Sequence, residues 1–238
     1  MIKTLSVIIP AFNEEPNLEL AINEVSDFLS KNVLDFEIIV INDGSIDRTE
    51  EIANKYLDKI RYFKNEENMG KGYTVKRGVY LAKKEKILFL DADLSTPVSD
   101  VLKLYQYVDS HDIIVGSRNL SNSNIISDQP FYRRIMGKTF ALITYFFSGL
   151  NIKDTQCGFK FFDSSAIKDI FGKSKINGWC FDVELLYIAN KLKYKTKEVP
   201  IQWINHTDTS KVRPLLTSLE MLRDLFKIRW YDFIGKYD

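Results

Sequence analysis

Hydrophobic and polar positions along the first half of the chain follow two alternating periods. Short runs of consecutive apolar residues are typical of buried parallel strands, and between them apolar residues recur every three or four positions, as on one face of a helix. The runs predict strands at 5–9, 36–41, 60–63, 87–90 and 112–115, and the intervening stretches predict helices near 15–31, 52–57, 75–82 and 98–108. Strands that alternate with helices predict an α/β fold with a mostly parallel, twisted sheet.

The pattern changes after residue 116. A polar stretch at 119–129 predicts a loop, and the segment at 139–152 is uncharged and rich in aromatic residues. This segment is too short to span a bilayer, so it either lies in a membrane interface or packs against the domain. The remaining pattern predicts a strand at 159–162, a helix at 181–192 and an extended segment at 196–204.

The C-terminal tail carries apolar residues on one helical face, at positions 215, 219, 222 and 226. We therefore expect one α/β domain at 1–213, with an acceptor or membrane-interface segment at about 119–152. An amphipathic helical tail at 214–238 follows it. Basic residues beside aromatic ones suit anionic lipid headgroups, and Arg133, Arg134 and Lys138 precede the uncharged segment.

Composition narrows the class of protein. The chain has 238 residues, 45% of them hydrophobic, which is enough for a real core and argues against disorder. Its net charge of +1 argues against nucleic-acid binding. Two cysteines, Cys157 and Cys180, are too few for a disulfide framework, and no apolar stretch reaches the length of a membrane span. We expect a cytoplasmic protein.

The sequence Phe89 to Thr96 holds the first candidate chemistry. Asp91 and Asp93 follow a buried strand, one residue apart, at the sheet edge where open α/β sheets bind ligands. Two such carboxylates repel each other unless a positive charge lies between them, and Mg²⁺ is commonly held by one or two carboxylates plus phosphate oxygens. The alternative is a strand-end acid followed by a helix cap before Pro97.

Other polar clusters also follow predicted strands, and their number favours the ligand-binding interpretation of the Asp-x-Asp pair. Asn13 and Glu14 follow the first strand, Asp43 follows the second, and Gly70-Lys71-Gly72 lies on a further loop. Parallel strands end at one edge of the sheet, so these residues are expected to converge there. Together these groups suit a nucleotide. The acids could bind its base or ribose, the lysine could bind a phosphate, and a metal could bind the diphosphate. The glycines do not form a P-loop, because its first glycine and its Ser/Thr are missing.

Six ordered motifs give the chain a family resemblance. The stretches at 7–15, 41–49, 68–72 and 91–95 resemble those of glycosyltransferase family 2, whose fold is GT-A. Two more, Asp-Thr-Gln-Cys-Gly-Phe-Lys-Phe-Phe at 154–162 and Trp-Cys-Phe-Asp-Val-Glu-Leu-Leu at 179–186, resemble the dolichyl-phosphate glucosyltransferases and related polyprenyl-phosphate sugar transferases. The resemblance extends over about residues 5–230.

The resemblance implies a metal-dependent, inverting transfer of a sugar, with glucose as the best guess, from a UDP-sugar to a polyprenyl or dolichyl phosphate. Mg²⁺ or Mn²⁺ would bind at Asp91 and Asp93. The implied nucleotide-sugar residues are Pro10, Ala11, Asn13, Glu14, Asp43, Gly70, Lys71, Asp91 and Ala92. The implied acceptor-phosphate residues are Arg118, Arg133, Arg134, Ser210 and Lys211, and the candidate catalytic residues are Asp93, Asp154 and Asp182. The partners would be a membrane surface, with the protein peripheral on its cytoplasmic face, and either a separate membrane partner or a second copy.

Several alternatives stay open at this point. Asp154 could cap a turn, and Asp182 and Glu184 could stabilise the first turn of the following helix. The aromatic residues at 140–147 could be ordinary core. The acceptor could be a soluble glycan or polysaccharide, and the donor could be GDP-mannose. The fold alone also permits a nucleotidyltransferase, and a catalytically inactive scaffold is a further rival, although the intact Asp91 and Asp93 argue against it.

Overall fold

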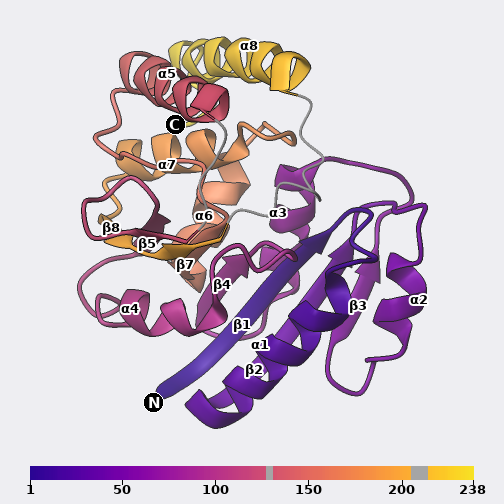
Figure 1. Ribbon diagram of the computed structural model, residues 1–238. Helices are drawn as coiled ribbons and strands as arrows, with labels where there is room; N and C mark the ends of the chain where they lie inside the picture. The colour runs from indigo at the N-terminus through magenta and orange to yellow at the C-terminus, as the bar shows by residue number, and fades with distance from the viewer. Residues whose placement is uncertain (127–130, 205–213) are drawn as a thin grey trace.

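The fold is that of a computed structural model, which describes residues 1–126, 131–204 and 214–238; the side chains of 131–138, 140 and 214–218 lie outside the description. Figure 1 shows a central sheet flanked by helices, with two further helices, α5 and α8, stacked side by side at one end of the molecule. The helices are α1 (Leu18–Asn32), α2 (Thr49–Asn54), α3 (Lys71–Leu81), the 3₁₀ turn η1 (Val98–Asp100), α4 (Val101–Tyr105), α5 (Phe131–Ser148), α6 (Ser164–Lys173), α7 (Phe181–Lys191) and α8 (Pro214–Phe233).

Within the described residues the main sheet has seven strands in the order β3-β2-β1-β4-β7-β5-β8. They are β1 (Ile2–Ala11), β2 (Val33–Asn42), β3 (Arg61–Lys64), β4 (Lys86–Leu90), β5 (Ile113–Ser117), β7 (Phe159–Asp163) and β8 (Thr196–Pro200). Neighbouring strands run parallel, except that β7 lies antiparallel between β4 and β5. The prediction of a mostly parallel α/β sheet is confirmed.

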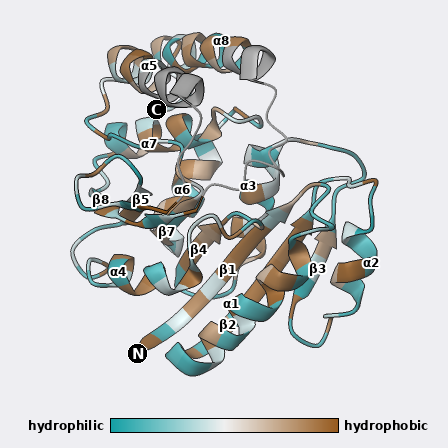
Figure 2. Ribbon diagram, viewed as in Figure 1, coloured by the Kyte–Doolittle hydropathy of each residue, from teal (hydrophilic) through white to brown (hydrophobic). Residues whose placement is uncertain are grey.

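The core lies on both faces of this sheet. The apolar runs of β1, β2 and β4 are fully covered, because helices pack on the two faces of a parallel sheet and leave no solvated side. In Figure 2 the hydrophobic colour follows the central strands and the hydrophilic colour follows the outer turns of the helices. The edge strand β3 is only half-buried, as expected for a strand with one free side.

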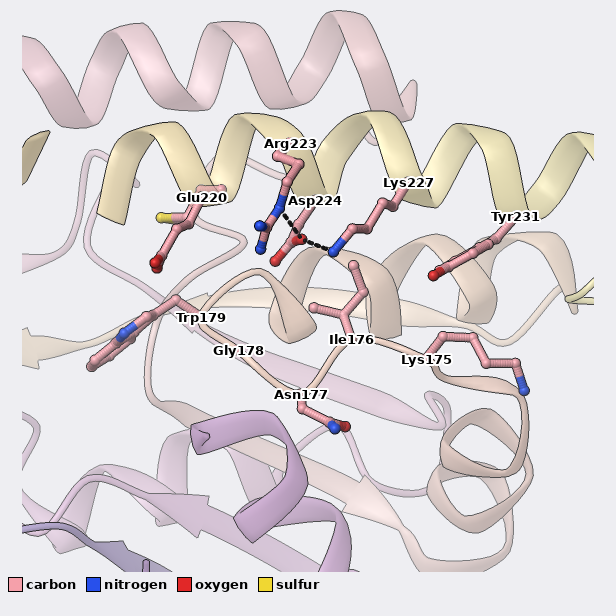
Figure 3. Close-up of a pocket in the computed structure, with 11 residues that line it drawn as sticks. Lys175, Ile176, Asn177, Gly178, Trp179, Glu220, Arg223, Asp224, Lys227 and Tyr231 are labelled. Carbon is pink, nitrogen blue, oxygen red and sulfur yellow. Dashed lines mark hydrogen bonds and ion pairs between the residues drawn. The ribbon is translucent and has the colours of Figure 1, made fainter. Parts of the chain in front are cut away.

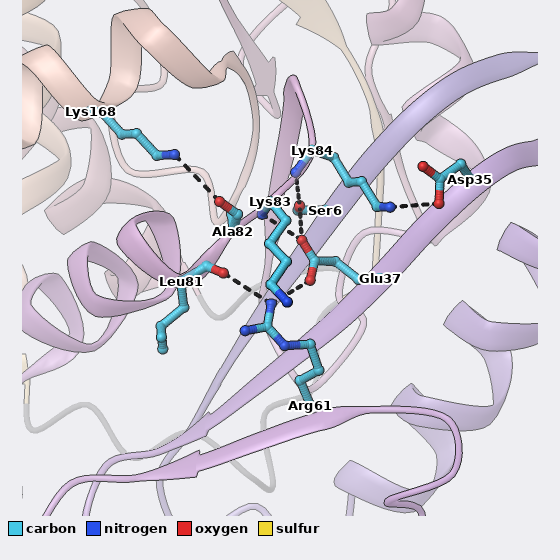
Figure 4. Close-up of polar contacts among 9 residues, drawn as sticks. All are labelled: Ser6, Asp35, Glu37, Arg61, Leu81, Ala82, Lys83, Lys84 and Lys168. Atoms are coloured by element: carbon cyan, nitrogen blue, oxygen red, sulfur yellow. Dashed lines mark hydrogen bonds and ion pairs between the residues drawn. The ribbon is translucent and has the colours of Figure 1, made fainter.

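A largely buried charged side chain lies in the middle of β2, away from the strand ends that carry the candidate site (Figure 4). Glu37 accepts hydrogen bonds from the Ser6 hydroxyl and the Lys83 amide, each at 2.6 Å, and pairs with Arg61. Arg61 also donates to the Leu81 carbonyl at 2.9 Å. Burial alone would raise the pKa of Glu37, but these hydrogen bonds lower it. The network fastens the C-terminal end of α3 to β1, β2 and β3.

The second half of the chain adds the helical layer that contains α5 and α8. β6 (Asn124–Ile125) and β9 (Gln202–Trp203) pair in a separate two-stranded ladder. In the sequence, β6 comes directly before α5 and β9 directly before α8. α5 and α8 pack through Phe147 and Phe226, whose ring centroids are 4.8 Å apart. No helix in the described ranges is both long and apolar enough to cross a membrane.

Candidate active site

Polar clusters at the ends of three neighbouring strands begin the candidate site. Asn13 and Glu14 follow β1, Asp43 follows β2, and Asp91 and Asp93 follow β4. β1 is parallel to both other strands, and Ala11 at its end pairs with Asn42 at the end of β2. The clusters therefore share the C-terminal edge of the sheet, as the sequence pattern predicts.

The loops after β1 and β2 are locked to each other by hydrogen bonds. The Asn13 amide donates to the Ser45 hydroxyl at 2.8 Å, and the Asn13 side-chain oxygen accepts from the Ile46 amide at 2.9 Å. The Glu14 amide donates to the Thr49 hydroxyl at 2.7 Å. Asn13 also has a positive φ of 53°, a conformation that asparagine tolerates better than most residues. This pair of loops forms a fixed platform at the strand ends.

Asp43 holds a third loop against that platform. Its carboxylate accepts hydrogen bonds from the side chain of Asn65 at 2.7 Å and from the amides of Met69 at 2.9 Å and Gly70 at 3.0 Å. Gly70 has φ of 95°, and a Cβ there would lie 2.5 Å from the Asn177 carbonyl oxygen, so a larger residue does not fit. Asp43 therefore positions the loop that leads to Lys71.

Lys71 meets the acidic pair at the end of β4. Its ammonium lies 2.7 Å from an Asp91 carboxylate oxygen and about 5 Å from the ring centres of Phe89 and Trp179, at 5.4 and 5.2 Å. Burial lowers the pKa of Lys71, but the neighbouring carboxylates, Asp91 first, raise it above its usual value. A Cβ at Gly158 would lie 1.9 Å from Asp91, so glycine is required for this close approach.

Asp93 remains open toward a ligand. Its carboxylate is half-buried and accepts a hydrogen bond from the Ser95 amide at 2.9 Å, and it makes no ion pair within the described part of the chain. Asp91 is about one-third exposed. Across the described residues no group of three or more His, Cys, Asp or Glu side chains could enclose a metal. Two partly open carboxylates fit a divalent ion that takes its other ligands from phosphate and water.

Arg118 and Asp154 form a second charge pair, from segments 36 residues apart. The guanidinium binds both carboxylate oxygens at 2.8 Å, and the Arg118 amide donates to the same carboxylate at 2.8 Å. Asp154 is 97% buried, which by itself raises its pKa, but Arg118 lowers that pKa below its usual value. Asp154 is therefore an anion at neutral pH, and it does more than cap a turn. Burial lowers the pKa of Arg118, but Asp154 raises it well above its usual value, and Asp91 adds a smaller contribution in the same direction.

Lys160 and Asp182 form a third pair, and sequence reasoning missed the lysine. The Lys160 ammonium is fully buried and lies 2.5 Å from Asp182, and it also donates to the Cys157 carbonyl at 2.6 Å. Burial raises the pKa of Asp182, opposed by Lys160 and then Lys71. A signal was present in the sequence, because a lysine inside the apolar strand 159–162 is almost never buried unless it is paired.

Glu184 turns out to be structural. Its carboxylate accepts hydrogen bonds from the amides of Lys175 at 2.9 Å and Ile176 at 2.8 Å and from the Tyr237 hydroxyl at 2.7 Å. It therefore holds the loop before α7 and the C-terminus together. Neither Asp182 nor Glu184 caps α7, whose N-cap residue is Cys180 without a side-chain hydrogen bond. Both acids do lie in the first turn of α7, as that interpretation expected, but their carboxylates bind Lys160, Tyr237 and the loop before the helix instead of capping it.

The other sequence-predicted residues divide into two groups. Pro10 and Ala11 lie at the end of β1, where the Ala11 carbonyl accepts from the Asp43 amide at 2.8 Å, and Ala92 is buried between the two acids. Ser210 and Lys211 lie outside the described residues, as do the side chains of Arg133 and Arg134.

Comparison with known proteins begins with the family. The sequence model of "Glycosyl transferase family 2" matches residues 6–171, more than half of the chain. The chain belongs to glycosyltransferase family 2. The match includes the strand-end acids, Lys71, Arg118 and Asp154, so the family's sequence pattern covers two of the three charge pairs and half of the third.

Curated relatives of this family 2 glycosyltransferase extend over nearly its whole length. The dolichyl-phosphate beta-glucosyltransferase of Dictyostelium discoideum is 37% identical over 247 residues, which cover 97% of this chain and 75% of that protein. The human dolichyl-phosphate beta-glucosyltransferase is 34% identical over 244 residues, covering 95% and 75%. The chain is thus a glycosyltransferase that is similar to this group.

Solved structures support the fold. Mannosyl-3-phosphoglycerate synthase of Rubrobacter xylanophilus superposes with a TM-score of 0.71 at 15% identity, covering 98% of this chain and 75% of that one. Glucosyl-3-phosphoglycerate synthase of Mycobacterium tuberculosis, solved with UDP, gives 0.69 at 18% identity, covering 94% and 79%. At these identities the likeness concerns the fold alone, and the fold is GT-A, as the sequence resemblance implies.

Proposed function

We propose that this family 2 glycosyltransferase transfers glucose, with inversion at the anomeric carbon, from UDP-glucose to a polyprenyl phosphate such as dolichyl phosphate. One observation carries the proposal. The acids Asp91 and Asp93 and the cation Lys71 lie at the end of β4, and Asp91 packs directly against Gly158, four residues after the Asp154 that binds Arg118. A diphosphate and an acceptor phosphate can therefore be bound side by side. The names of the relatives at 34–37% identity agree with this substrate pair.

On the donor side, Asp91 and Asp93 are the residues that would hold Mg²⁺ or Mn²⁺, which supplies charge neutralisation of the leaving diphosphate. Lys71, whose ammonium lies 2.7 Å from Asp91, would contact the same diphosphate. The platform formed by Pro10, Ala11, Asn13, Glu14 and Asp43 would receive the nucleoside, with Gly70 and Ala92 at its border. A solved structural neighbour of the same fold was crystallised with Mn²⁺, UDP and its sugar product.

On the acceptor side, Arg118 would bind the acceptor phosphate in addition to Asp154. Its Nε and one terminal nitrogen bind Asp154, and the other terminal nitrogen makes no hydrogen bond in the described part of the chain. That nitrogen can donate to a phosphate oxygen while Asp154 holds the guanidinium plane still. Arg133, Arg134, Ser210 and Lys211 would complete the phosphate site.

The reaction needs little proton transfer. A phosphate oxygen of the acceptor is already ionised near neutral pH, so it can attack the anomeric carbon without a strong general base. Asp154 stays ionised because Arg118 lowers its pKa, and its charge would help to stabilise an oxocarbenium-like centre. Asp182 would act through the charge balance that it shares with Lys160 and Lys71.

The lipid acceptor implies a membrane surface, and α5 and α8 supply a suitable face. We define the α5–α8 apolar face by its exposed large hydrophobic residues: Leu142, Tyr145, Phe146, Leu219, Phe226, Trp230 and Phe233. Aromatic and apolar side chains exposed on amphipathic helices bind at the headgroup boundary of a bilayer. The protein would then lie peripherally on the cytoplasmic face of the membrane.

Purified protein incubated with radiolabelled UDP-glucose, Mg²⁺ and a polyprenyl phosphate in detergent tests the proposal. The expected product is a glucosyl lipid phosphate, recovered in organic solvent, together with UDP. GDP-mannose in place of UDP-glucose should give no product. Transfer to a soluble glycan with none to the lipid, a preference for GDP-mannose, or release of pyrophosphate would contradict the proposal.

A further inference from the structure

The loop that precedes α7, residues 175–179, borders open space on the side of α8. It lines one wall of a pocket of about 340 Å³, and residues of α8 between Glu220 and Tyr231 line the other wall. In Figure 3 the loop passes beneath α8, and Asn177 lies on the side of the loop that faces away from that helix. A pocket is packed less densely than a protein interior, so α8 constrains the loop little on this side. Hydrogen bonds on the other sides of the loop determine its position.

Glu184, in the first turn of α7, holds the start of the loop. Its carboxylate accepts hydrogen bonds from the Lys175 amide at 2.9 and 3.0 Å and from the Ile176 amide at 2.8 Å. The Glu184 side chain is fully buried, and so is its hydrogen bond to Ile176. Water does not readily replace a buried acceptor, so removing this carboxylate would release the start of the loop.

Tyr237 holds Glu184 from the opposite side. Its hydroxyl donates to the same carboxylate at 2.7 Å, and the whole residue is buried. The chain reaches this position because α8 ends in a reversing turn, in which Gly235 has φ of 71° and the Lys236 amide donates to the Tyr231 carbonyl at 2.9 Å. The turn directs the segment after α8 back toward α7.

The middle of the loop caps α3. The Asn177 carbonyl accepts hydrogen bonds from the Gly72 amide at 2.7 Å and from the Tyr73 amide at 3.2 Å. Both amides belong to the first turn of α3, where a helix has no acceptor of its own. The N-cap residue is Gly70, which has no side chain that could accept instead. The loop therefore supplies the cap of this helix.

Lys71 lies between two glycines that pack on this carbonyl. A Cβ at Gly70 would lie 2.5 Å from the Asn177 carbonyl oxygen, and a Cβ at Gly72 would lie 2.9 Å from it. The Lys71 ammonium in turn lies 2.7 Å from Asp91. Because the residues on both sides of Lys71 contact the loop, a shift of the loop would move Lys71 with respect to Asp91.

We infer that Glu184 and Tyr237 are positioning residues for Lys71: together they clamp the loop at 175–177, and the loop caps α3 at the residue where that helix begins. We call the two residues the Glu184–Tyr237 clamp. The segment after α8 thereby determines how Lys71 meets Asp91, although the two are far apart in the sequence. The contact of Lys71 with a diphosphate rests on the proposed function, whereas the clamp itself does not.

Two variants open the clamp, and a third is a matched control. Tyr237→Phe removes one hydroxyl and keeps the ring, and Glu184→Ala removes every hydrogen bond of the carboxylate. The control is Tyr187→Phe. Its hydroxyl also binds a carboxylate, that of Asp232 at 2.6 Å, and accepts from Arg229 at 2.9 Å, and its ring lies 6.1 Å from the ring of Tyr237. The same atom is thus removed next to the clamp but outside it.

Amide hydrogen exchange in the free protein, followed by NMR, measures the clamp without any ligand. Among the described residues the Asn177 carbonyl is the acceptor for the Gly72 and Tyr73 amides, so their exchange rates report the contact with the loop. Loss of the clamp hydroxyl should speed exchange at both amides roughly tenfold, and the alanine variant should speed it further. The control should leave both rates unchanged. Unchanged rates in both clamp variants, or an equal increase in the control, would overturn the inference.

Calorimetric titration with UDP and Mg²⁺ tests the link to Lys71. Glu184→Ala should weaken UDP binding roughly tenfold, and in a Lys71→Met background the same substitution should cause no further weakening. Tyr237→Phe takes its place in this cycle if melting curves show that Glu184→Ala does not fold. Additive losses in the double variant, or unchanged UDP binding in spite of faster exchange, would separate the clamp from Lys71 and overturn the inference. If the wild type does not bind UDP, the proposed function fails, and hydrogen exchange alone then decides whether the clamp holds α3.

Discussion

Single residues of the candidate site work in pairs of opposite charge. Lys71–Asp91, Arg118–Asp154 and Lys160–Asp182 each bring a cation to a carboxylate within 2.9 Å. Asp93 is the acid near them without an ion pair in the described part of the chain. Because this carboxylate is half-exposed and has no ion pair, it is available to bind a metal ion.

Replacing Asp93 by alanine should abolish transfer and leave the fold intact. The side chain is half-buried and supports one amide, so stability should change by about 1 kcal/mol or less. Activity with Mg²⁺ should fall a hundredfold or more, because the metal contributes several kcal/mol of charge stabilisation. Initial rates and melting curves measure the two effects. Asp109→Ala, an exposed acid remote from the strand ends, is the matched control. Near wild-type turnover of Asp93→Ala, or full activity in EDTA, would contradict the metal role.

Removing Lys160 should separate stability from activity. Lys160→Met leaves Asp182 buried and unpaired, which typically costs about 3–5 kcal/mol. In the double variant with Asp182→Asn, no buried charge is left alone, so much of the stability should return. Urea denaturation measures this part. The activity of the double variant should stay low if the pair sets the charge balance around Lys71. Full recovery of activity would make the pair purely structural.

At the level of elements, the strands carry the chemistry and the helices set the surroundings. The C-terminal ends of β1, β2 and β4 bring the acids together, because parallel strands end at one edge. In the middle of β2, Glu37 joins the end of α3 to three strands through its hydrogen bonds and its pair with Arg61. The α5–α8 apolar face is built from two helices that pack on each other through Phe147 and Phe226.

Glu37→Gln should reduce stability in a pH-dependent way. The hydrogen bonds that lower the pKa of Glu37 stabilise the folded state above the ordinary glutamate pKa of 4.5, and this contribution is lost as the pH falls through the lower, folded value. At pH 7 the variant should be less stable by about 1.5–3 kcal/mol. The difference from the wild type should shrink in acid. Urea titrations at pH 7 and below pH 4 measure it, and an equal difference at both values would contradict the assignment.

Flotation with anionic liposomes tests the α5–α8 apolar face. Phe146 is 74% exposed and Phe233 is 82% exposed, so replacing both by aspartate should release the protein and leave the packing of the two helices intact. Phe147 is not a suitable site, because its ring contacts Phe226. Leu34→Asp, at an exposed leucine near the start of β2, is the control and should still float. A wild type that never floats would favour a soluble acceptor.

On the scale of the whole molecule, the site is assembled from both halves of the chain. Residues up to Asp93 supply the proposed donor edge, and residues from Arg118 onward supply the proposed acceptor pair and the buried Lys160–Asp182 pair. β7 joins the halves, because it lies antiparallel between β4 and β5 and carries Lys160. A ligand that contacts both halves should therefore stabilise the fold as one unit.

Donor binding should raise the melting temperature by mass action. At a concentration of one hundred times Kd, a ligand adds about 2.7 kcal/mol, which for a chain of this size corresponds to roughly 5–10 °C. UDP with Mn²⁺ should give a larger shift than UDP alone, and Asp93→Ala should remove the effect of the metal. Differential scanning fluorimetry measures these shifts. A larger shift with GDP than with UDP would move the donor to the GDP-sugar class.

The sequence by itself located the strands of the main sheet to within a few residues, and with them the acids that follow β1, β2 and β4. Apolar runs encode burial and extended backbone locally, and parallel strands have to share an edge, so Asn13, Asp43, Asp91 and Asp93 could be grouped before any coordinates. The family motifs added the identity of the chemistry. The strand prediction and the family resemblance both rest on residues that are close together in the sequence, where a local pattern is informative.

Only the tertiary structure decided how the charges are paired. Arg118 and Asp154 are 36 residues apart and Lys160 and Asp182 are 22 apart, and no local pattern states which cation meets which acid. The antiparallel insertion of β7 was equally hidden, because an apolar run has no direction in its sequence. The pocket beneath α8 depends on a helix docking against a loop some 45 residues earlier, as with Gly178 and Arg223. Such contacts follow from the packing of the whole chain, and packing is where the sequence pattern stops being informative.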